Sequence, residues 1–322
     1  MTRRVVICAL FGLVASITAC GSSEPESPDR STTAGEGQTI AVSEEGLLYA
    51  AWEEGSPTHA KYPWEDESLM LNVYAPEEPA GSPIVIFFPG GGGSATASPF
   101  FERLVGEGVI VFGVRHAFVD SLTPSLMLPD PTDHGANFRA TADSAVCAIR
   151  FARERAAELG STDPVVVLAG FSGGGGVAAI AALNGTSLEA RWDEYASAGG
   201  PSSEIKCEVT EGSTHVDALI GMTGLYDIFV PIFDGKYGSV YQQERDPELQ
   251  QFLSGVIGAN PDLKVRLFHG ADDEWIPSEN SAGFAAALAD AGYDVEFTTF
   301  DGGHETPPSE LSLPAVMEVL GR

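Results

Sequence analysis

Positive charge is scarce in this 322-residue sequence: 17 Lys and Arg residues stand against 46 Asp and Glu residues, which gives a net charge of −29. A surface this acidic repels phosphate backbones, so nucleic acid is excluded as a partner. The same charge disfavours docking on anionic lipid by electrostatics alone. Cysteine is also rare, and four residues are too few to build a disulfide scaffold in a chain of this length.

The sequence is equally poor in long apolar runs outside its folded core. The run at residues 5–17 is too short for a permanent transmembrane helix. With 43% hydrophobic and 20% charged residues, the chain can nevertheless bury a substantial core. These proportions indicate a soluble, acidic globular protein, either an enzyme or a binder of small molecules.

The first twenty residues have the order of a secretory signal. Arg3 and Arg4 precede the apolar run, which ends in the small-residue segment Ile17-Thr18-Ala19-Cys20. That segment resembles the lipobox of bacterial lipoproteins. The resemblance implies cleavage before Cys20 and lipidation of its thiol, whereas an ordinary cleaved signal with an incidental Cys20 is the alternative.

Three consecutive segments follow from this interpretation. Residues 1–19 are expected to be the signal peptide, and residues 20–40, rich in Ser, Pro and Glu without apolar periodicity, a flexible tether. Residues 41–322 are expected to form the folded domain. The protein would then act outside the cytoplasm, held to the cell membrane by the lipid on Cys20, or would be secreted if lipidation is absent.

Apolar runs and helical stripes alternate along the remaining chain. Short runs rich in β-branched and aromatic residues predict strands at 69–74, 83–88, 109–114, 165–169, 216–220, 265–268 and 295–300. Apolar positions at three- and four-residue steps, or alanine-rich composition, predict helices at 137–159, 177–183, 278–291 and 310–320. Strands separated by helices predict one α/β domain with a mostly parallel sheet.

The strongest chemical signal is the segment Gly170-Phe171-Ser172-Gly173-Gly174, between the strand at 165–169 and the helix after it. A nucleophile at such a turn needs strained backbone angles, and the flanking glycines let strand and helix approach closely. The free N–H groups of the following helix favour negative charge near Ser172. A plain glycine-rich turn is the structural alternative.

A second glycine-rich segment, Pro89 to Gly93, follows the strand at 83–88. Its backbone N–H groups could face an oxyanion together with the N–H of Gly173. The same segment fits a loose dinucleotide fingerprint, Gly90-x-Gly92-x-x-Ala95. That alternative expects an acidic residue at the end of the next strand, where the sequence has Val-Arg-His, so it explains less.

An acid and an imidazole follow at the ends of two later strands. The segment HGADDEWIP at 269–277 supplies Asp272, Asp273 and Glu274, and the segment DGGHE at 301–305 supplies His304. The order Ser, acid, His, each at the carboxyl end of a strand, is typical of one hydrolase architecture.

On these residues the domain resembles an α/β-hydrolase, and within that fold the carboxylesterases and lipases that carry a His-Gly-Gly-Gly loop. The resemblance covers about residues 69–320 and includes NVYAP at 72–76 and IVIFFPGGGG at 84–93. It implies a mostly parallel central sheet with helices on both faces, and short insertions rather than a large lid domain.

The resemblance also assigns roles to residues. Ser172 takes the position of the nucleophile and His304 that of the base, and alignment on HGADDEWIP puts the family's acid on Asp273 rather than Asp272 or Glu274. The implied oxyanion-hole donors are the backbone N–H groups of Gly91, Gly92 and Gly173. Pro89 replaces the family's first histidine, which puts the rigidity of the loop and the substrate preference in doubt.

The function implied by this arrangement is hydrolysis of a small-molecule carboxylic ester through an acyl-enzyme on Ser172, with no cofactor and no metal. A catalytically silent ligand-binding lipoprotein of the same fold is one alternative. A serine peptidase or polyester hydrolase with the same triad is another, because the fold does not choose among these activities.

Other residues receive structural interpretations. His269 is expected to be a hydrogen-bonding residue at a strand end, and His116 to line the cleft. Cys147 and Cys207 could form a disulfide outside the cytoplasm, but their positions in the sequence do not establish one. The apolar and aromatic segments at 116–135 and 225–241 are expected to shape a substrate pocket.

Overall fold

The computed structural model describes residues 40–61, 68–91, 95–117, 134–197, 199, 202–226, 256–306 and 309–322. All of them belong to one compact unit, Gly37–Arg322. The signal peptide, Cys20 and the tether up to residue 39 lie outside the described residues. So do Gly92 and most of the segments 116–135 and 225–241, which were predicted to shape the pocket.

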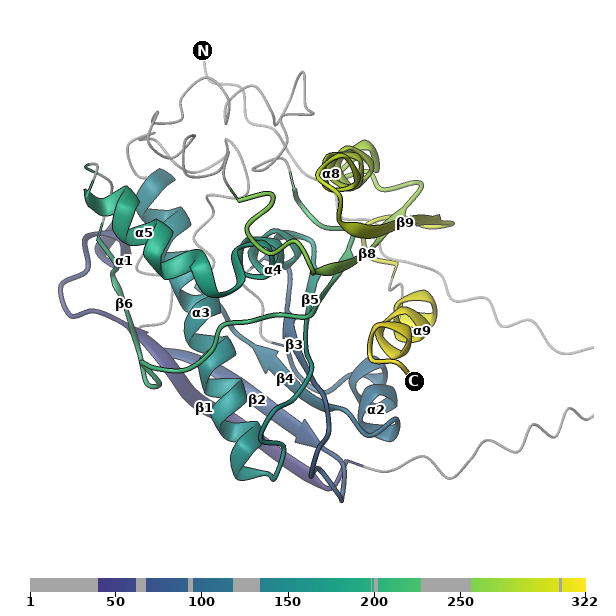
Figure 1. Ribbon diagram of the computed structural model, residues 1–322, viewed down its shortest axis with the longest axis horizontal. Coiled ribbons are helices and arrows are strands. Elements are labelled where there is room, and N and C mark those ends of the chain that lie inside the picture. The colour runs from purple at the N-terminus through teal and green to yellow at the C-terminus, as the bar shows by residue number, and fades with distance from the viewer. Residues whose placement is uncertain are drawn as a thin grey trace, which may run out of the picture. The chain divides into compact units, whose positions relative to one another are not determined.

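Within the described residues, nine strands form one sheet in the order β6-β1-β2-β4-β3-β5-β7-β8-β9 (Figure 1). Their bounds are β1 Val42–Trp52, β2 Ser68–Ala75, β3 Ile84–Phe88, β4 Ile110–Val114, β5 Val166–Phe171, β6 Ile205–Cys207, β7 Ala218–Met222, β8 Lys264–Gly270 and β9 Asp294–Phe300. From β4 to β9 all neighbours are parallel, while β1, β2 and β6 pair antiparallel at one side. The predicted mostly parallel sheet is confirmed.

Helices cover both faces of this sheet, as predicted. The described helices are α1 Pro57–Lys61, α2 Pro99–Gly106, α3 His134–Glu158, α4 Gly173–Asn184, α5 Leu188–Ser197, α8 Glu279–Asp290 and α9 Ser309–Val319. One apolar core lies between the sheet and α3, α4, α5 and α8, and a second lies between the sheet and the adjacent helices α2 and α9 (Figure 1). None of the described helices has the length and apolarity needed to cross a membrane.

The central strands are buried on both faces, and their sequences explain why. Every residue of β4 (IVFGV) and of β7 (ALIGM) is buried, as expected of continuous apolar strands covered by two helical layers. The edge strand β9 instead has no buried residue and alternates between half-buried and exposed positions over most of its length. The parallel strands all end at one edge of the sheet, which is where the loops after β3, β5, β8 and β9 meet.

Residues 185–215 form an insertion between α4 and β7 that contains regular structure. They include α5 and the short strand β6, which pairs with β1 at the antiparallel side of the sheet. A disulfide joins Cys147 on α3 to Cys207 at the end of β6, with Cα atoms 5.1 Å apart. The bridge that the sequence left open therefore fixes this insertion to the helical layer.

Candidate active site

Ser172 occupies a strained turn between β5 and α4. Its backbone angles are φ 53° and ψ −127°, and among the described non-glycine residues only Thr223 shares a positive φ. A Cβ on Gly170 would collide with the carbonyl oxygen of Gly174, and a Cβ on Gly174 would collide with that of Phe88. The two glycines therefore let α4 approach β5 and β3 this closely. Strain held in this way is typical of a nucleophile elbow.

The imidazole of His304 lies between the other two side chains of the predicted triad. Its Nε2 is 3.0 Å from Ser172 Oγ, and its Nδ1 is 2.8 Å from Asp273 Oδ2. A carboxylate only accepts hydrogen bonds, so Nδ1 carries the proton and Nε2 is left to accept the serine hydroxyl proton. The structure thus brings together three side chains that are 31 and 132 positions apart in the sequence.

Asp273 is held by the turn that follows β8. Its side chain is fully buried, and Oδ1 accepts the backbone N–H groups of Trp275 and Ile276, both at 2.8 Å. The remaining oxygen, Oδ2, faces His304. The neighbouring acids Asp272 and Glu274 are exposed. Of the three acids that the sequence offered, it is Asp273 whose carboxylate meets the imidazole.

His269 contacts Asp273 and has a structural role rather than that of a second base. Its Nε2 is 2.8 Å from the carbonyl oxygen of Ile276 and 3.2 Å from Asp273 Oδ2, and its Nδ1 is 2.6 Å from Ser281 Oγ. Burial lowers the pKa of His269 below its ordinary value of 6.5, which favours the neutral ring. Nε2–H then donates to the carbonyl and Nδ1 accepts from the serine, in line with the structural role that the sequence suggested.

The glycine-rich loop after β3 passes directly beside Ser172. A Cβ on Gly90 would lie 2.8 Å from Ser172 Cβ, and the next residue, Gly91, has a φ of +58°. Gly173 is the first residue of α4, where N–H groups have no partner within the helix. Gly90 and Gly173 therefore both border Ser172, Gly91 follows Gly90 directly, and Gly92 lies outside the described residues.

Pro89, which stands where the resembled family has histidine, is fixed by a different histidine. His116 Nε2 lies 3.0 Å from the carbonyl oxygen of Pro89, and burial lowers the pKa of His116 below 6.5. His116 is almost completely buried, so it supports the loop instead of lining an open cleft as predicted. The sequence placed His116 near the site but gave no signal for this contact.

Two aromatic rings flank the His304 imidazole, and sequence analysis assigned neither to the site. The Phe171 ring centroid lies 5.2 Å from that of His304 at 44°, and the Trp275 ring lies 5.4 Å away at 4°, a parallel stack. Phe171 directly precedes Ser172, and Trp275 follows Asp273 by two residues. Because both residues lie within the motifs that contain Ser172 and Asp273, their positions in the sequence could have indicated that they belong to the site.

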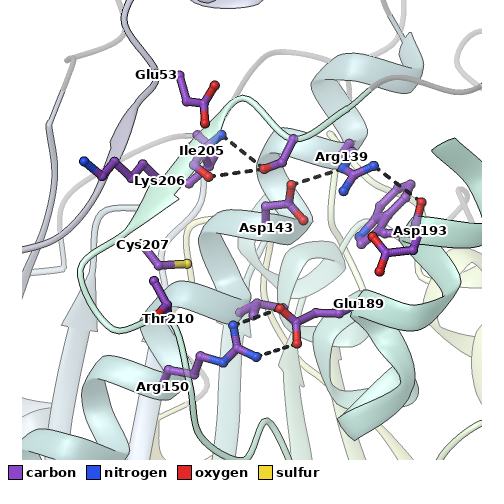
Figure 2. Close-up of a pocket in the computed structure, with 13 residues that line it drawn as sticks. Glu53, Arg139, Asp143, Arg150, Glu189, Asp193, Ile205, Lys206, Cys207 and Thr210 are labelled. Atoms are coloured by element: carbon purple, nitrogen blue, oxygen red, sulfur yellow. Dashed lines mark hydrogen bonds and ion pairs between the residues drawn. The ribbon is translucent and has the colours of Figure 1, made fainter.

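A separate hollow of 480 Å³ lies between α3, α5 and β6, and no triad residue lines it (Figure 2). Its two buried arginines are both paired. Arg139 Nε lies 3.3 Å from Asp143, and Arg150 forms a two-pronged ion pair with Glu189 (Figure 2). The Arg150–Glu189 pair joins α3 to α5, and Arg139 also reaches α5 by donating to the carbonyl oxygen of Trp192 at 3.4 Å. In the part of the chain that the structure describes, no cluster of His, Cys, Asp or Glu could hold a metal ion.

Comparison with solved structures shows that this chain has the α/β-hydrolase fold. A truncated carbohydrate esterase from gut microbiota superposes with a TM-score of 0.57 at 18% identity, over 88% of this chain and 98% of the other. An acetyl ester-xyloside bifunctional hydrolase from Caldicellulosiruptor lactoaceticus gives 0.55 at 20% identity, over 85% and 93%. These identities establish the fold alone.

Curated relatives are similar in sequence as well. The chain is 27% identical over 246 residues to a probable isoprenylcysteine alpha-carbonyl methylesterase of Oryza sativa subsp. japonica, covering 73% of this chain and 55% of the relative. A second probable isoprenylcysteine alpha-carbonyl methylesterase, from Arabidopsis thaliana, is also 27% identical, over 255 residues, covering 73% of this chain and 48% of the relative. The chain thus spans about half the length of these relatives. No family model matches the sequence.

Proposed function

We propose that this protein is a serine hydrolase of carboxylic esters that forms an acyl-enzyme on Ser172. The observation that carries the proposal is the hydrogen-bonded line from Ser172 Oγ through His304 to Asp273, at 3.0 and 2.8 Å. The similarity to proteins named as methylesterases supports the same reaction class. A ligand-binding protein has no need of all three groups in this alignment.

The geometry supports a two-step reaction. His304 Nε2 takes the proton of Ser172 as Oγ attacks the ester carbonyl, and then gives a proton to the departing alcohol. Asp273 keeps the ring in the required tautomer and stabilises the imidazolium. Water enters by the same route and releases the acid.

Negative charge that develops on the carbonyl oxygen needs donors already aimed at it. We assign this role to the backbone N–H groups of Gly91, Gly92 and Gly173. A well-aimed donor of this kind contributes on the order of 3 kcal/mol to stabilising the transition state. The strained turn at Ser172 and the close approach of Gly90 support the assignment, because they bring the glycine-rich loop and the start of α4 to the same point.

The test is hydrolysis of short p-nitrophenyl esters by the purified protein, together with covalent labelling by an organophosphonate. We expect turnover and one label per chain, and the loss of both in Ser172→Ala. Ser197→Ala, which removes a hydroxyl on α5 away from the triad, is the matched control and should retain both. Undiminished turnover in Ser172→Ala would refute the proposed nucleophile.

We further propose that the protein acts outside the cytoplasm, attached to the membrane by a lipid on Cys20. The order of Arg3 and Arg4, the apolar run and the Ile-Thr-Ala-Cys segment supports this proposal. The Cys147–Cys207 disulfide agrees with an oxidising compartment. Cys20→Ala should leave the protein unprocessed or release it into the medium. A membrane-bound Cys20→Ala variant with the mass of the wild-type protein would contradict the anchor.

A further inference from the structure

Trp275 is the most exposed of the large apolar side chains described in the structure. It is 62% exposed, compared with 37% for Leu48 and 40% for Val165. Burying an indole stabilises a fold, so packing alone does not explain why this ring remains in solvent. It lies at the active site, because one face of the indole stacks on His304 while His304 itself is only 3% exposed.

The chemistry of the proposed reaction determines which part of a substrate meets this ring. The departing alcohol oxygen must come within hydrogen-bond distance of His304 Nε2, about 3 Å, to receive its proton. The carbonyl oxygen instead faces the glycine-rich loop and the start of α4. The alcohol portion of the ester therefore leaves on the side of His304, where Trp275 covers the ring at a centroid distance of 5.4 Å.

The surroundings of Trp275 restrict the kind of alcohol that fits. An open indole face favours a partner with a flat face, such as an aryl ring or the C–H face of a pyranose. Glu274, Asp301 and Glu305 are exposed on the same two loops, so an anionic alcohol would meet repulsion. The favoured partner is a neutral ring.

We propose that Trp275 is a specificity-determining residue that forms the alcohol subsite and selects esters of neutral, ring-bearing alcohols. This inference rests on the ester hydrolysis proposed above. Aryl and pyranosyl alcohols share the flat face that the stack requires, and the experiment below separates them. The other ring beside His304 belongs to Phe171, and the two ring planes meet at 44°. Phe171 is half-buried, so it contacts the imidazole but does not offer a comparable exposed surface.

The experiment compares acetates that differ only in the alcohol. One pair is benzyl acetate and heptyl acetate, and the other is a monoacetylated methyl pyranoside and a monoacetylated acyclic polyol. In Trp275→Leu we expect the ratio of kcat/KM for the ring ester to that for its acyclic partner to fall about three- to tenfold, the value of one aromatic stack. Trp275→Phe should restore most of the ratio. Leu48→Ala, which trims an exposed apolar side chain on β1, should leave it unchanged.

A second measurement separates substrate contact from support of His304. All acetates give the same acetyl-enzyme, so its hydrolysis rate does not depend on the alcohol. If Trp275→Leu slows the ring and acyclic esters equally, or slows only deacylation, the ring acts through His304 and the alcohol subsite is refuted. A loss confined to benzyl acetate, or to the pyranoside, identifies the kind of ring. Failure of the esterase proposal looks different, because organophosphonate labelling and dependence on Ser172 would then be absent in the unmodified protein.

Discussion

Replacing Asp273 with asparagine should leave the fold intact and remove most of the activity. Asp273 uses Oδ1 to accept the N–H groups of Trp275 and Ile276 at 2.8 Å, and an asparagine carbonyl can keep both bonds. The other oxygen, which accepts His304 Nδ1–H at 2.8 Å, becomes an amide NH₂ group. Two donors would then face each other, so the imidazole would carry its proton on Nε2 instead.

A proton on His304 Nε2 occupies the lone pair that would otherwise accept the hydroxyl proton of Ser172, whose Oγ lies 3.0 Å away. The same replacement in the serine-protease triad lowers kcat by about 10⁴, and we expect a loss of about 10³ to 10⁴ here. At 1.36 kcal/mol for each factor of ten, that loss corresponds to about 4 to 5 kcal/mol of transition-state stabilisation.

The assay is kcat on a short-chain ester, with circular dichroism as a check that the variant is folded. Asp272→Asn is the matched control, because this neighbouring acid is exposed and the substitution keeps its backbone N–H, which donates to Gly302 O at 2.9 Å. We expect Asp272→Asn to change kcat less than about threefold. A folded Asp273→Asn variant with more than about a tenth of the wild-type kcat would refute the tautomer argument.

Three further predictions concern stability. Burial lowers the pKa of His116 and of His269 below 6.5, so as the pH falls the unfolded chain takes up protons before the folded chain does. In urea titrations between about pH 8 and about pH 5, the free energy of unfolding should therefore decrease once the pH is lower than about 6.5. The decrease should be less steep in His269→Gln. Reducing the Cys147–Cys207 bridge, which closes a loop of 60 residues, should cost about 4 kcal/mol in the same titrations if loop entropy dominates, and an unchanged midpoint would count against that origin. Gly174→Ala would drive a Cβ into the Phe88 carbonyl oxygen, so its melting temperature should drop sharply or soluble expression should fail.

The parallel strands could be predicted because burial on both faces demands uninterrupted apolar sequence. The runs at 83–88 and 109–114 correspond to β3 and β4 within one residue at their starts, and the predicted helix at 137–159 corresponds to α3. The antiparallel strand β1 was missed. It is half-exposed, contains Gly46 and pairs with β2 through two register shifts, so neither a continuous run nor a regular alternation marks it.

The short strand β6 and the disulfide could not be predicted from the sequence either, because both depend on contacts between distant segments. β6 has three residues and exists through its pairing with β1, which is more than 150 positions earlier in the chain. That pairing places Cys207 opposite Ala50 of β1, and the disulfide joins it to Cys147 on α3. Since β6 has no pattern of its own and depends on a distant strand, the contact carries no local signal.

The triad was within reach of sequence reasoning because topology does most of the positioning. Parallel strands have their carboxyl ends at one edge of the sheet, so the residues just after β5, β8 and β9 lie at the same edge. The contacts of those residues could not be predicted in this way, since they depend on the direction in which each side chain points. The carboxylate of Asp273 turns inward to His304 while the indole two residues later stacks over the same ring and stays in solvent. The elbow, the acid and the base therefore define the reaction that we propose, and the exposed ring beside them is where selection among alcohols is to be tested.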